Sequence, residues 1–177
     1  MRSQMRSPAL AACLTFALAG SAVADPALTA PLKDGKGQTV GTVTLTEAPN
    51  GVLLRVEAQG LPPGWHGMHF HEKGACQGPK FESAGGHVHM GSGAPKHGFL
   101  NADQTDSGDL PNLYVAPDGK VLVELFSDKV RLRQGAGSVP PLLGTDGASV
   151  IVHANPDDYT SQPIGGAGAR IACASLT

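Results

Sequence analysis

Histidine is clustered in this sequence in a pattern that indicates metal binding. Five of the seven histidines lie between Gly67 and Asp109, and a sixth, His153, follows an apolar run much later in the chain. Imidazole is a good ligand for copper and zinc, and several imidazoles without a thiolate suit redox-active copper. The spacing predicts that His153 completes a copper site begun by His69 and His71.

His69 and His71 lie two residues apart in a predicted strand. Alternate side chains of a strand point to opposite faces, so the two imidazoles converge outside the core while Met68 and Phe70 enter it. Taken alone, such a pair is equally consistent with two surface histidines. The apolar run that ends at His153 favours a metal site, because an exposed ring has little reason to lie there.

A second group of candidate ligands follows on loop segments. His87, His97 and Asp109, with Asp106 nearby, offer nitrogen and oxygen ligands of the kind that bind tetrahedral zinc. His87 follows two glycines, which allow close approach of the backbone. An imidazole that has lost both protons has two ligating nitrogens, so His87 can serve both metals.

The elements that position these residues are predicted to be short strands. The 177 residues include 24 glycines and 14 prolines, and only 5% are aromatic, which favours one all-β domain with many turns. Hairpins are expected around residues 49–51 and 116–119. Eight strands without an amphipathic helix predict an antiparallel Greek-key barrel or sandwich. They cover residues 39–46, 52–58, 65–71, 113–115, 121–126, 130–132, 149–153 and 170–174.

Two long irregular segments separate these strands, over residues 72–112 and 154–169. Loops of this length in a compact domain are usually functional or disordered. Both segments contain histidine or aspartate, and most of the candidate ligands lie in or beside them. A functional role is therefore favoured for both.

Residues 1–24 have the pattern of an export signal. A basic start, an apolar stretch too short to span a bilayer and the cleavage motif Ala22-Val23-Ala24 follow one another. The expected organisation is a signal peptide over 1–24 and one domain over 25–177, exported to the periplasm or beyond without stable membrane insertion. Lipidation at Cys13 is the alternative, although few apolar residues precede it.

Removal of that segment changes the charge and the cysteine count. The net charge of the full chain is −2, and loss of Arg2 and Arg6 leaves 11 basic and 15 acidic side chains, a net charge of −4. Without a basic run, nucleic acid is not an expected partner. The remaining Cys76 and Cys173 are expected to form one disulfide rather than two free thiols. A closed loop of about 100 residues would stabilise the fold by roughly 4 to 5 kcal/mol in the chain-entropy account.

Six separated motifs occur in the chain in one order with plausible spacings. They are Gly67-Met68-His69-Phe70-His71, Ser83-Ala84-Gly85-Gly86-His87, Lys96-His97-Gly98, Gly108-Asp109-Leu110, Val152-His153-Ala154-Asn155-Pro156-Asp157-Asp158 and Gly168-Ala169-Arg170-Ile171-Ala172-Cys173. Between about Val40 and Leu176 the chain therefore resembles copper-zinc superoxide dismutase in its bacterial exported form. The resemblance implies an eight-stranded antiparallel Greek-key barrel with two long functional loops.

The resemblance also implies roles for individual residues. It implies four copper ligands, His69, His71, His87 and His153. It implies three zinc ligands, His87, His97 and Asp109. Asp157 would accept hydrogen bonds from ligands of both metals, and Arg170 would act in catalysis beside the copper, together with the bridging histidine. Cys76 and Cys173 match the family's disulfide.

One position departs from the family pattern. Where the family has a third zinc histidine, three residues before the zinc aspartate, this chain has Asp106. A carboxylate can bind zinc, so a site of His87, His97, Asp106 and Asp109 is the expectation, although two carboxylates would nearly cancel the charge of the ion. His89 is another candidate for the fourth ligand. A weak or empty zinc site with a solvated Asp106 is the third alternative.

The implied function is dismutation of superoxide, a small anion, to dioxygen and hydrogen peroxide by a redox-cycling copper ion. Zinc would hold His87, whose imidazole could return a proton to the substrate, and Arg170 would attract the anion. A periplasmic copper carrier or buffer without turnover is the alternative, but it has no use for a cation beside its copper. A cupredoxin-like electron carrier needs a cysteine ligand, and both cysteines are better assigned to the disulfide.

The oligomeric state is left open by the sequence. A homodimer is compatible with the pattern, because alternation alone does not separate an apolar strand face in a dimer contact from one in the core. Trp65 is expected to be a packing or interface residue, and His66 a structural residue on the strand face opposite His69.

Overall fold

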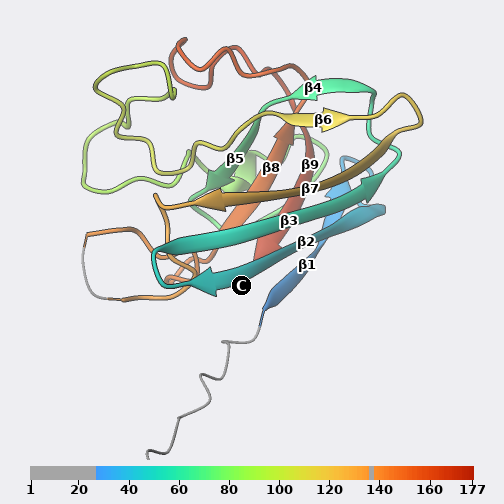
Figure 1. The fold of residues 1–177 in the computed structure, drawn as a ribbon. Helices are drawn as coiled ribbons and strands as arrows, with labels where there is room; N and C mark the ends of the chain where they lie inside the picture. The colour runs from blue at the N-terminus through green and yellow to red at the C-terminus, as the bar shows by residue number, and fades with distance from the viewer. Residues whose placement is uncertain (1–26, 136–137) are drawn as a thin grey trace, which may run out of the picture.

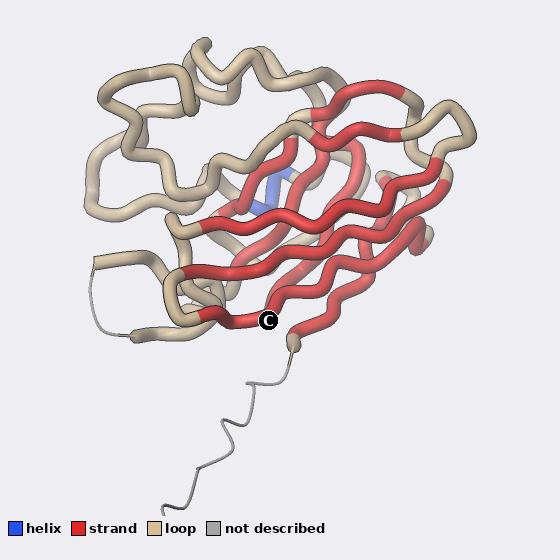
Figure 2. Tube along the Cα trace, viewed as in Figure 1, coloured by secondary structure: helices blue, strands red, loops and turns tan. Residues whose placement is uncertain are grey.

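The computed structural model describes residues 27–135 and 138–177, so the predicted signal segment 1–24 and its Cys13 lie outside the described residues. The described chain consists of strands and loops, with one short 3-10 turn, Glu82–Ala84 (Figure 2). No helix of the described part is long and apolar enough to span a membrane. The strands are β1 (Leu28–Asp34), β2 (Thr39–Ala48), β3 (Gly51–Gln59), β4 (Gly64–His66), β5 (Met68–His71), β6 (Leu113–Val115), β7 (Lys120–Ser127), β8 (Ala148–His153) and β9 (Arg170–Leu176).

Seven strands form one antiparallel sheet in the order β5-β8-β9-β1-β2-β3-β7, and β4 and β6 form a second sheet of two strands. The large sheet curves over, so that β5, β8 and β9 lie behind β7, β3 and β2, with β4 and β6 along the upper edge (Figure 1). Alternate residues of both layers, such as Val43, Leu54 and Val150, are fully buried in one apolar core. The prediction of an all-β antiparallel barrel is confirmed, and so is the first hairpin, β2–β3.

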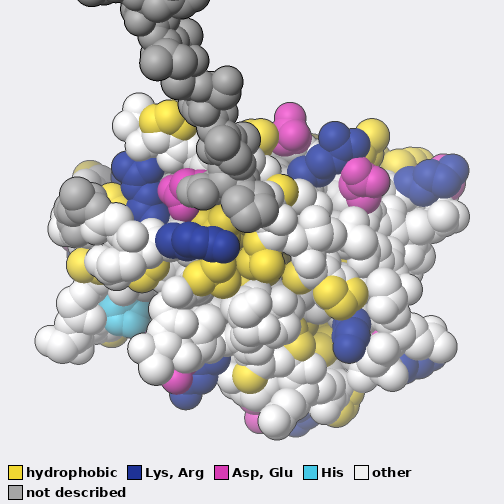
Figure 3. Space-filling model, turned by 90° about the horizontal axis from the view of Figure 1, so that it is seen from below, with side chains coloured by type: hydrophobic (Ala, Val, Ile, Leu, Met, Phe, Trp, Pro, Cys, Tyr) yellow, Lys and Arg dark blue, Asp and Glu magenta, His cyan; other side chains and the backbone are white. Residues whose placement is uncertain are grey.

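The face of the domain that is seen from below is mixed in character. Seen from below, lysine, arginine, aspartate and glutamate side chains are scattered among apolar and neutral ones (Figure 3). No extended basic face is visible in this view, in line with the acidic balance of the sequence.

β1 is a strand that the alternation pattern did not predict. Its sequence contains Pro31, which lacks the N–H needed for a ladder hydrogen bond and is normally confined to sheet edges. In the structure Pro31 pairs with Thr42 of β2, whereas pairing with β9 begins one residue later, at Leu32. Proline is tolerated because this half of β1 has a neighbour on one side only.

The predicted strand over residues 65–71 is divided at Gly67 into β4 and β5. At this point the chain passes from the small sheet, where β4 pairs with β6, to the large sheet, where β5 pairs with β8. A Cβ atom at Gly67 would lie 2.8 Å from the Cβ atom of Ala167, which is closer than van der Waals contact. The crossing therefore requires glycine.

Two further predictions about strands are wrong. β6 and β7 are joined by the expected turn at 116–119, but they do not form a hairpin, because β6 pairs with β4 and β7 with β3. Residues 130–132 form no strand, and Arg131 makes only an isolated bridge with Pro141. The alternation in this segment reflects two buried side chains that anchor a loop in the core.

The two long loops are confirmed as segments without strands between β5 and β6 and between β8 and β9. The predicted disulfide is also present, since Cys76 of the first loop is bonded to Cys173 of β9 across a separation of 97 residues. Phe81, Ala84 and Ile151 are buried beside it in a small apolar cluster of their own. The first loop is thereby held against the outer face of β8 and β9.

Candidate metal centre

The first long loop covers β5, which is an edge strand of the large sheet. The N–H of Phe70 donates to the carbonyl of Gly108 at 2.8 Å, and the carbonyl of Phe70 accepts from the N–H of Val88 at 2.9 Å. Isolated bridges join two candidate ligands of the loop to two of the strand, His87 with His71 and Asp109 with His69. The loop closes the open edge of the sheet and brings both sets of candidates together.

The two faces of β5 are divided as predicted, but both are buried. Met68 and Phe70 lie in the core, and His69 and His71 on the opposite face also have 0% exposure. The alternation predicted that the two imidazoles lie outside the core, and the structure instead buries them. The loop pairing along β5 covers them, an effect that the strand pattern alone does not reveal.

Three candidate copper ligands each use one ring nitrogen in a fixed hydrogen bond. His69 Nε2 donates to Asp157 Oδ2 at 2.8 Å, and His71 Nδ1 donates to the carbonyl of Gly85 at 3.0 Å. His153 Nδ1 donates to a loop carbonyl, that of Gly168, also at 3.0 Å. These bonds orient the rings and determine which nitrogen stays free.

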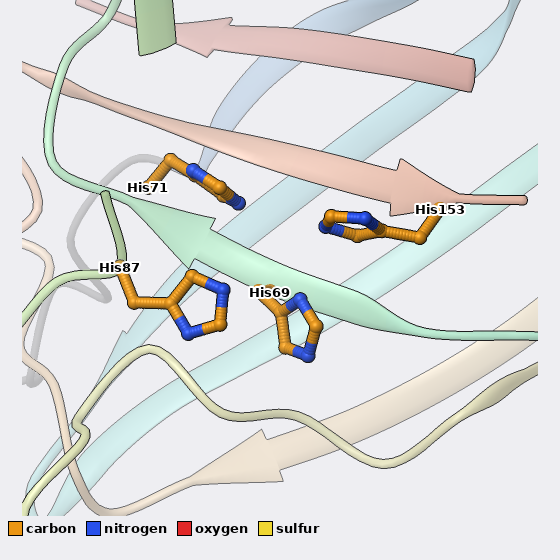
Figure 4. Close-up of side chains that lie close together, drawn as sticks. All are labelled: His69, His71, His87 and His153. Carbon is orange, nitrogen blue, oxygen red and sulfur yellow. The ribbon is translucent and has the colours of Figure 1, made fainter. Parts of the chain in front are cut away.

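Within the described part of the chain, four ring nitrogens are buried without a hydrogen-bond partner: His69 Nδ1, His71 Nε2, His87 Nε2 and His153 Nε2. One nitrogen from each of these residues lies within 4.8 Å of the others, and the rings face one another across the space between β5, β8 and the loop (Figure 4). A buried polar atom without a partner costs about 1–3 kcal/mol. A cation bound by all four lone pairs would remove that penalty, and four imidazoles without a thiolate fit copper.

The second group of candidates forms a compact cluster on the loop. His87 Nδ1 lies 2.6 Å from Asp106 Oδ2, and His97 Nδ1 lies 2.6 Å from Asp109 Oδ1. The crossed distances are 3.6 Å between His87 and Asp109 and 3.7 Å between His97 and Asp106. All four residues are buried, and two nitrogens with two carboxylate oxygens fit tetrahedral zinc. His87 has one nitrogen in each group.

Asp157 connects the two groups. Its Oδ2 accepts from His69 Nε2 at 2.8 Å, and its Oδ1 accepts from His97 Nε2 at 3.0 Å. These residues and Asp109 have donor atoms close enough to form a third candidate group. We interpret that group as the hydrogen-bonded link between the other two, because Asp157 already occupies the Nε2 atom of both rings.

Backbone and amide donors orient the carboxylates of the second group. Asp109 Oδ2 accepts from the N–H of Gly98 and from Gln104 Nε2, both at 2.8 Å. Asp106 Oδ1 accepts from the N–H of Gly108 at 2.9 Å. The other oxygen of each carboxylate is turned toward the imidazoles. Gln104 was not predicted from the sequence, where its only signal is its place in the loop between two candidate ligands.

His89 and His66 lie outside both groups. His89 is half-buried, and its Nδ1 donates to the carbonyl of His87 at 2.9 Å, which accounts for that nitrogen without a metal. The ring nitrogens of His66 lie 2.7 Å from the carbonyl of His153 and 2.8 Å from that of Pro62. This buried ring fastens the end of β8, in agreement with the structural role expected for it.

Arg170 is fixed beside the first group at the start of β9. Its Nη1 donates to the carbonyl of Phe81 and its Nη2 to that of Gly85, both at 2.7 Å. The Gly85 carbonyl also accepts from His71, so the guanidinium lies next to that ring. Arg170 lines an open depression of about 390 Å³ together with Pro79, Lys80, Glu82, Gly168 and Ala169. An anion in this depression would meet a positioned cation.

Burial keeps three rings of the first group neutral, those of His69, His71 and His153. Desolvation is the main cause that lowers the pKa of His69, His71 and His153, to about 3 for His153. The positive charge of Arg170 lowers the pKa of His71 further. Neutral imidazoles at neutral pH keep a lone pair available for a metal.

The second group has the opposite electrostatics. Burial opposes protonation of His87 and His97, but hydrogen bonds to Asp106 and Asp109 outweigh it and raise both pKa values, to about 11 for His97. Burial likewise disfavours the charged carboxylates, yet the same bonds lower the pKa of Asp106 and Asp109. The metal-free cluster thus holds protons in the place where a cation fits.

Binding of zinc to the metal-free protein at pH 7 is therefore expected to release at least about one proton per ion. The raised pKa of His97, about 11, means that this imidazole is protonated at pH 7, and its Nδ1 must lose the proton before it can bind a metal; the raised pKa of His87 acts in the same direction. Calorimetric titration in two buffers of different ionisation enthalpy measures the number. A value near zero at pH 7 would show that these imidazoles are neutral or are not ligands.

Comparison with known proteins agrees with this architecture. The family model of copper/zinc superoxide dismutase matches residues 39–176, most of the chain. The chain belongs to this family. Within the copper/zinc superoxide dismutase family, the superoxide dismutase [Cu-Zn] of Caulobacter vibrioides is 58% identical over 145 residues, which are 82% of this chain and 82% of that protein. The predicted family resemblance and its two metals, copper and zinc, are thus confirmed.

Solved structures of the copper/zinc superoxide dismutase family share the fold. A double mutant of a superoxide dismutase-like protein from Bacillus subtilis has a TM-score of 0.78 and 39% identity, covering 84% of this chain and 95% of that one. The Cu/Zn superoxide dismutase of Brucella abortus has a TM-score of 0.69 and 30% identity, covering 86% of this chain and all of that one, 100%.

Proposed function

We propose that this protein converts superoxide to dioxygen and hydrogen peroxide as a copper/zinc superoxide dismutase. The observation that carries the proposal is the group of four unpartnered imidazole nitrogens beside the anchored guanidinium of Arg170. Family membership and a superoxide dismutase relative at 58% identity support the same activity. A copper carrier would need the imidazoles but not the cation.

The ligand assignments form part of this proposal. Copper is assigned to His69, His71, His87 and His153, the copper group, whose free nitrogens converge. Zinc is assigned to His87, His97, Asp106 and Asp109, the zinc group. Asp106 is preferred to His89 because its carboxylate lies 2.6 Å from His87 Nδ1, while His89 is in neither group.

Bound copper supplies one-electron chemistry, in which one superoxide is oxidised to dioxygen and a second is reduced, with two protons, to hydrogen peroxide. The protein's part is to hold the rings, the substrate and a proton. His87 Nε2 faces the copper group while Nδ1 stays in the zinc group, so Nε2 can hold a proton and return it to the substrate. Asp157 keeps the ring of His69 in one orientation throughout.

Arg170→Ala is expected to slow superoxide removal about ten-fold at low ionic strength with copper and zinc contents unchanged, because a fixed cation in a depression raises the encounter rate with a small anion. The difference from wild type should shrink as salt is added. Arg133→Ala, which removes the same charge from an exposed position, serves as the control and should leave the rate unchanged. Equal rates for the Arg170 variant and wild type at every salt concentration would remove its proposed role.

The activity itself is tested with the purified protein loaded with both metals. Superoxide removal should far exceed that of the same amounts of free copper and zinc. Copper bound at the four-imidazole group without a rate above these free-metal controls would contradict the enzyme and favour a copper carrier.

We also propose export to the periplasm, with residues 1–24 as the signal peptide and 25–177 as the mature domain. The basic and apolar pattern of that segment and the disulfide between Cys76 and Cys173 support this localisation. Amino-terminal sequencing of the protein from a periplasmic fraction should begin at Asp25. A start that retains Met1, or a lipid-modified Cys13, would be inconsistent with this processing.

A homodimer is proposed for the assembly. Trp65 and Tyr114 face each other across β4 and β6 with ring centroids 5.0 Å apart, and their exposures are 56% and 49%. An exposed aromatic pair of this kind is a suitable centre for a protein contact, which supports the proposal.

A further inference from the structure

Two side-chain amides hold the long loops together in a reciprocal way. Gln162 of the second loop accepts from the N–H of His97 at 3.0 Å and donates to the carbonyl of His97 at 2.8 Å. Asn112, at the end of the first loop, accepts from the N–H of Asp157 and donates to its carbonyl, both at 2.8 Å. Each amide satisfies both backbone groups of one residue in the opposite loop, as a neighbouring strand would.

The two residues held in this way also meet through their side chains. His97 Nε2 donates to Asp157 Oδ1 at 3.0 Å, which closes a ring of contacts between the loops. Asn101 adds a third connection, because its Nδ2 donates to the carbonyl of His97 at 2.5 Å and to that of Thr160 at 3.0 Å. The backbone of His97 therefore cannot shift without displacing the second loop.

We propose that Gln162 and Asn112 are positioning residues that form a reciprocal latch, through which occupation of the zinc group orders the segment 154–169. The inference rests on the proposed zinc ligands. Zinc bound to His97 would fix that backbone, and the latch would transmit the constraint to Asp157. The second loop also carries Gly168, whose carbonyl orients His153, so its order bears on the copper group.

The chemistry of the amide explains why these positions need Gln and Asn. Only a group with a donor and an acceptor at one end can pair with both the N–H and the carbonyl of one residue. Glutamate at position 162 would keep the acceptor and lose the donor, and its charge would lie against the carbonyl of His97. Gln162 is itself exposed, so its replacement removes these bonds without opening the core.

The first test measures the zinc affinity of the full chain by competition with a chelator. Gln162→Ala and Asn112→Ala should each weaken zinc binding about ten-fold, the lower end of the range for groups that orient metal ligands. Gln162→Glu should weaken zinc binding as much as Gln162→Ala does. Gln38→Ala changes an exposed glutamine distant in sequence from both loops, and it should have the zinc affinity of wild type. Wild-type affinity in both latch variants would overturn the proposal.

The second test uses hydrogen exchange to follow each loop separately. In wild type, zinc should protect amides in 96–109 and also in 156–162. In the double variant Gln162→Ala with Asn112→Ala, zinc should protect 96–109 while the protection of 156–162 is lost. Equal protection of 156–162 in both proteins would overturn the latch.

If zinc protects neither loop of the wild-type protein, the proposed zinc ligands are wrong, and the metal-free protein still tests the latch. There, Gln162→Ala should speed exchange of the His97 amide and also of the Asp157 amide in the other loop. Asn112→Ala should have the same two effects. A change confined to the amide that has lost its own partner would show two separate local contacts and would overturn the latch.

Discussion

Replacing His87 by alanine is expected to damage both metal sites at once and to lower superoxide removal at least about 100-fold, the upper end of the loss seen when a residue that merely orients a ligand is changed. The reason is geometric. His87 Nε2 is one of four buried nitrogens in the copper group, and Nδ1 lies 2.6 Å from Asp106 in the zinc group. Metal analysis and a superoxide assay on the same sample measure the effect.

His89 provides the matched control for this substitution. It lies two residues away on the same loop, is half-buried, and contributes to neither group. His89→Ala should keep both metals and most of the rate. Loss of zinc in His89→Ala with zinc retained in His87→Ala would reverse the assignment of the two histidines.

Asp106→Ala is expected to lower zinc affinity by at least about ten-fold while copper remains bound. Asp106 supplies one of the two carboxylate oxygens in the group, and its side chain is completely buried against His87 and His97. Without it, the group keeps three candidate ligands and loses one negative charge. Chelator competition gives the affinity, and copper content measured in the same preparation gives the selectivity of the effect.

Two further variants make the Asp106 prediction specific. Asp103→Ala removes an exposed carboxylate that pairs with Lys96 on the same loop, and it should leave zinc affinity unchanged. Asp106→His introduces the imidazole that the family pattern predicts, and it should restore much of the zinc binding lost in Asp106→Ala. Unchanged zinc affinity in Asp106→Ala would exclude this carboxylate as a ligand.

The arrangement of His69 and His71 in the proposed copper group could be predicted from the sequence, because it depends on the local alternation of side chains along one strand. The alternation along β5 places His69 and His71 on the face opposite Met68 and Phe70, and the structure has this arrangement. The burial of the two imidazoles could not be predicted in this way. It depends on loop backbone that pairs with the outer edge of β5, a contact between segments far apart in sequence.

The zinc group shows the limit of a linear pattern more clearly. Asp106, His89 and an empty site were all open alternatives, because the sequence does not show how the loop returns along β5. In the structure, Ser107 N–H donates to the carbonyl of Val88 at 3.0 Å, and the pairing of these two loop segments directs His87 and Asp106 to the same side. Gln162 and Asn112 had no sequence signal, since an amide in a polar loop is ordinary.

The wrong predictions about strands have similar causes. No strand was predicted over β1, which contains Pro31, and the staggered pairing with β2 and β9 shows why proline is tolerated there. The turn at 116–119 was correctly predicted, but a turn does not determine which strands pair. β6 and β7 have separate partners because β4, which precedes the crossing at Gly67, pairs with β6 in the small sheet, whereas β7 pairs with β3 in the large sheet.

The most direct measurement is a crystal structure of the metal-loaded protein with anomalous diffraction recorded at the copper and zinc absorption edges. The predicted result is a copper peak among His69, His71, His87 and His153 and a zinc peak among His87, His97, Asp106 and Asp109, with His87 between them. A zinc peak bound by His89 without Asp106, or a single metal at the four-imidazole group with none at Asp106, would contradict the account.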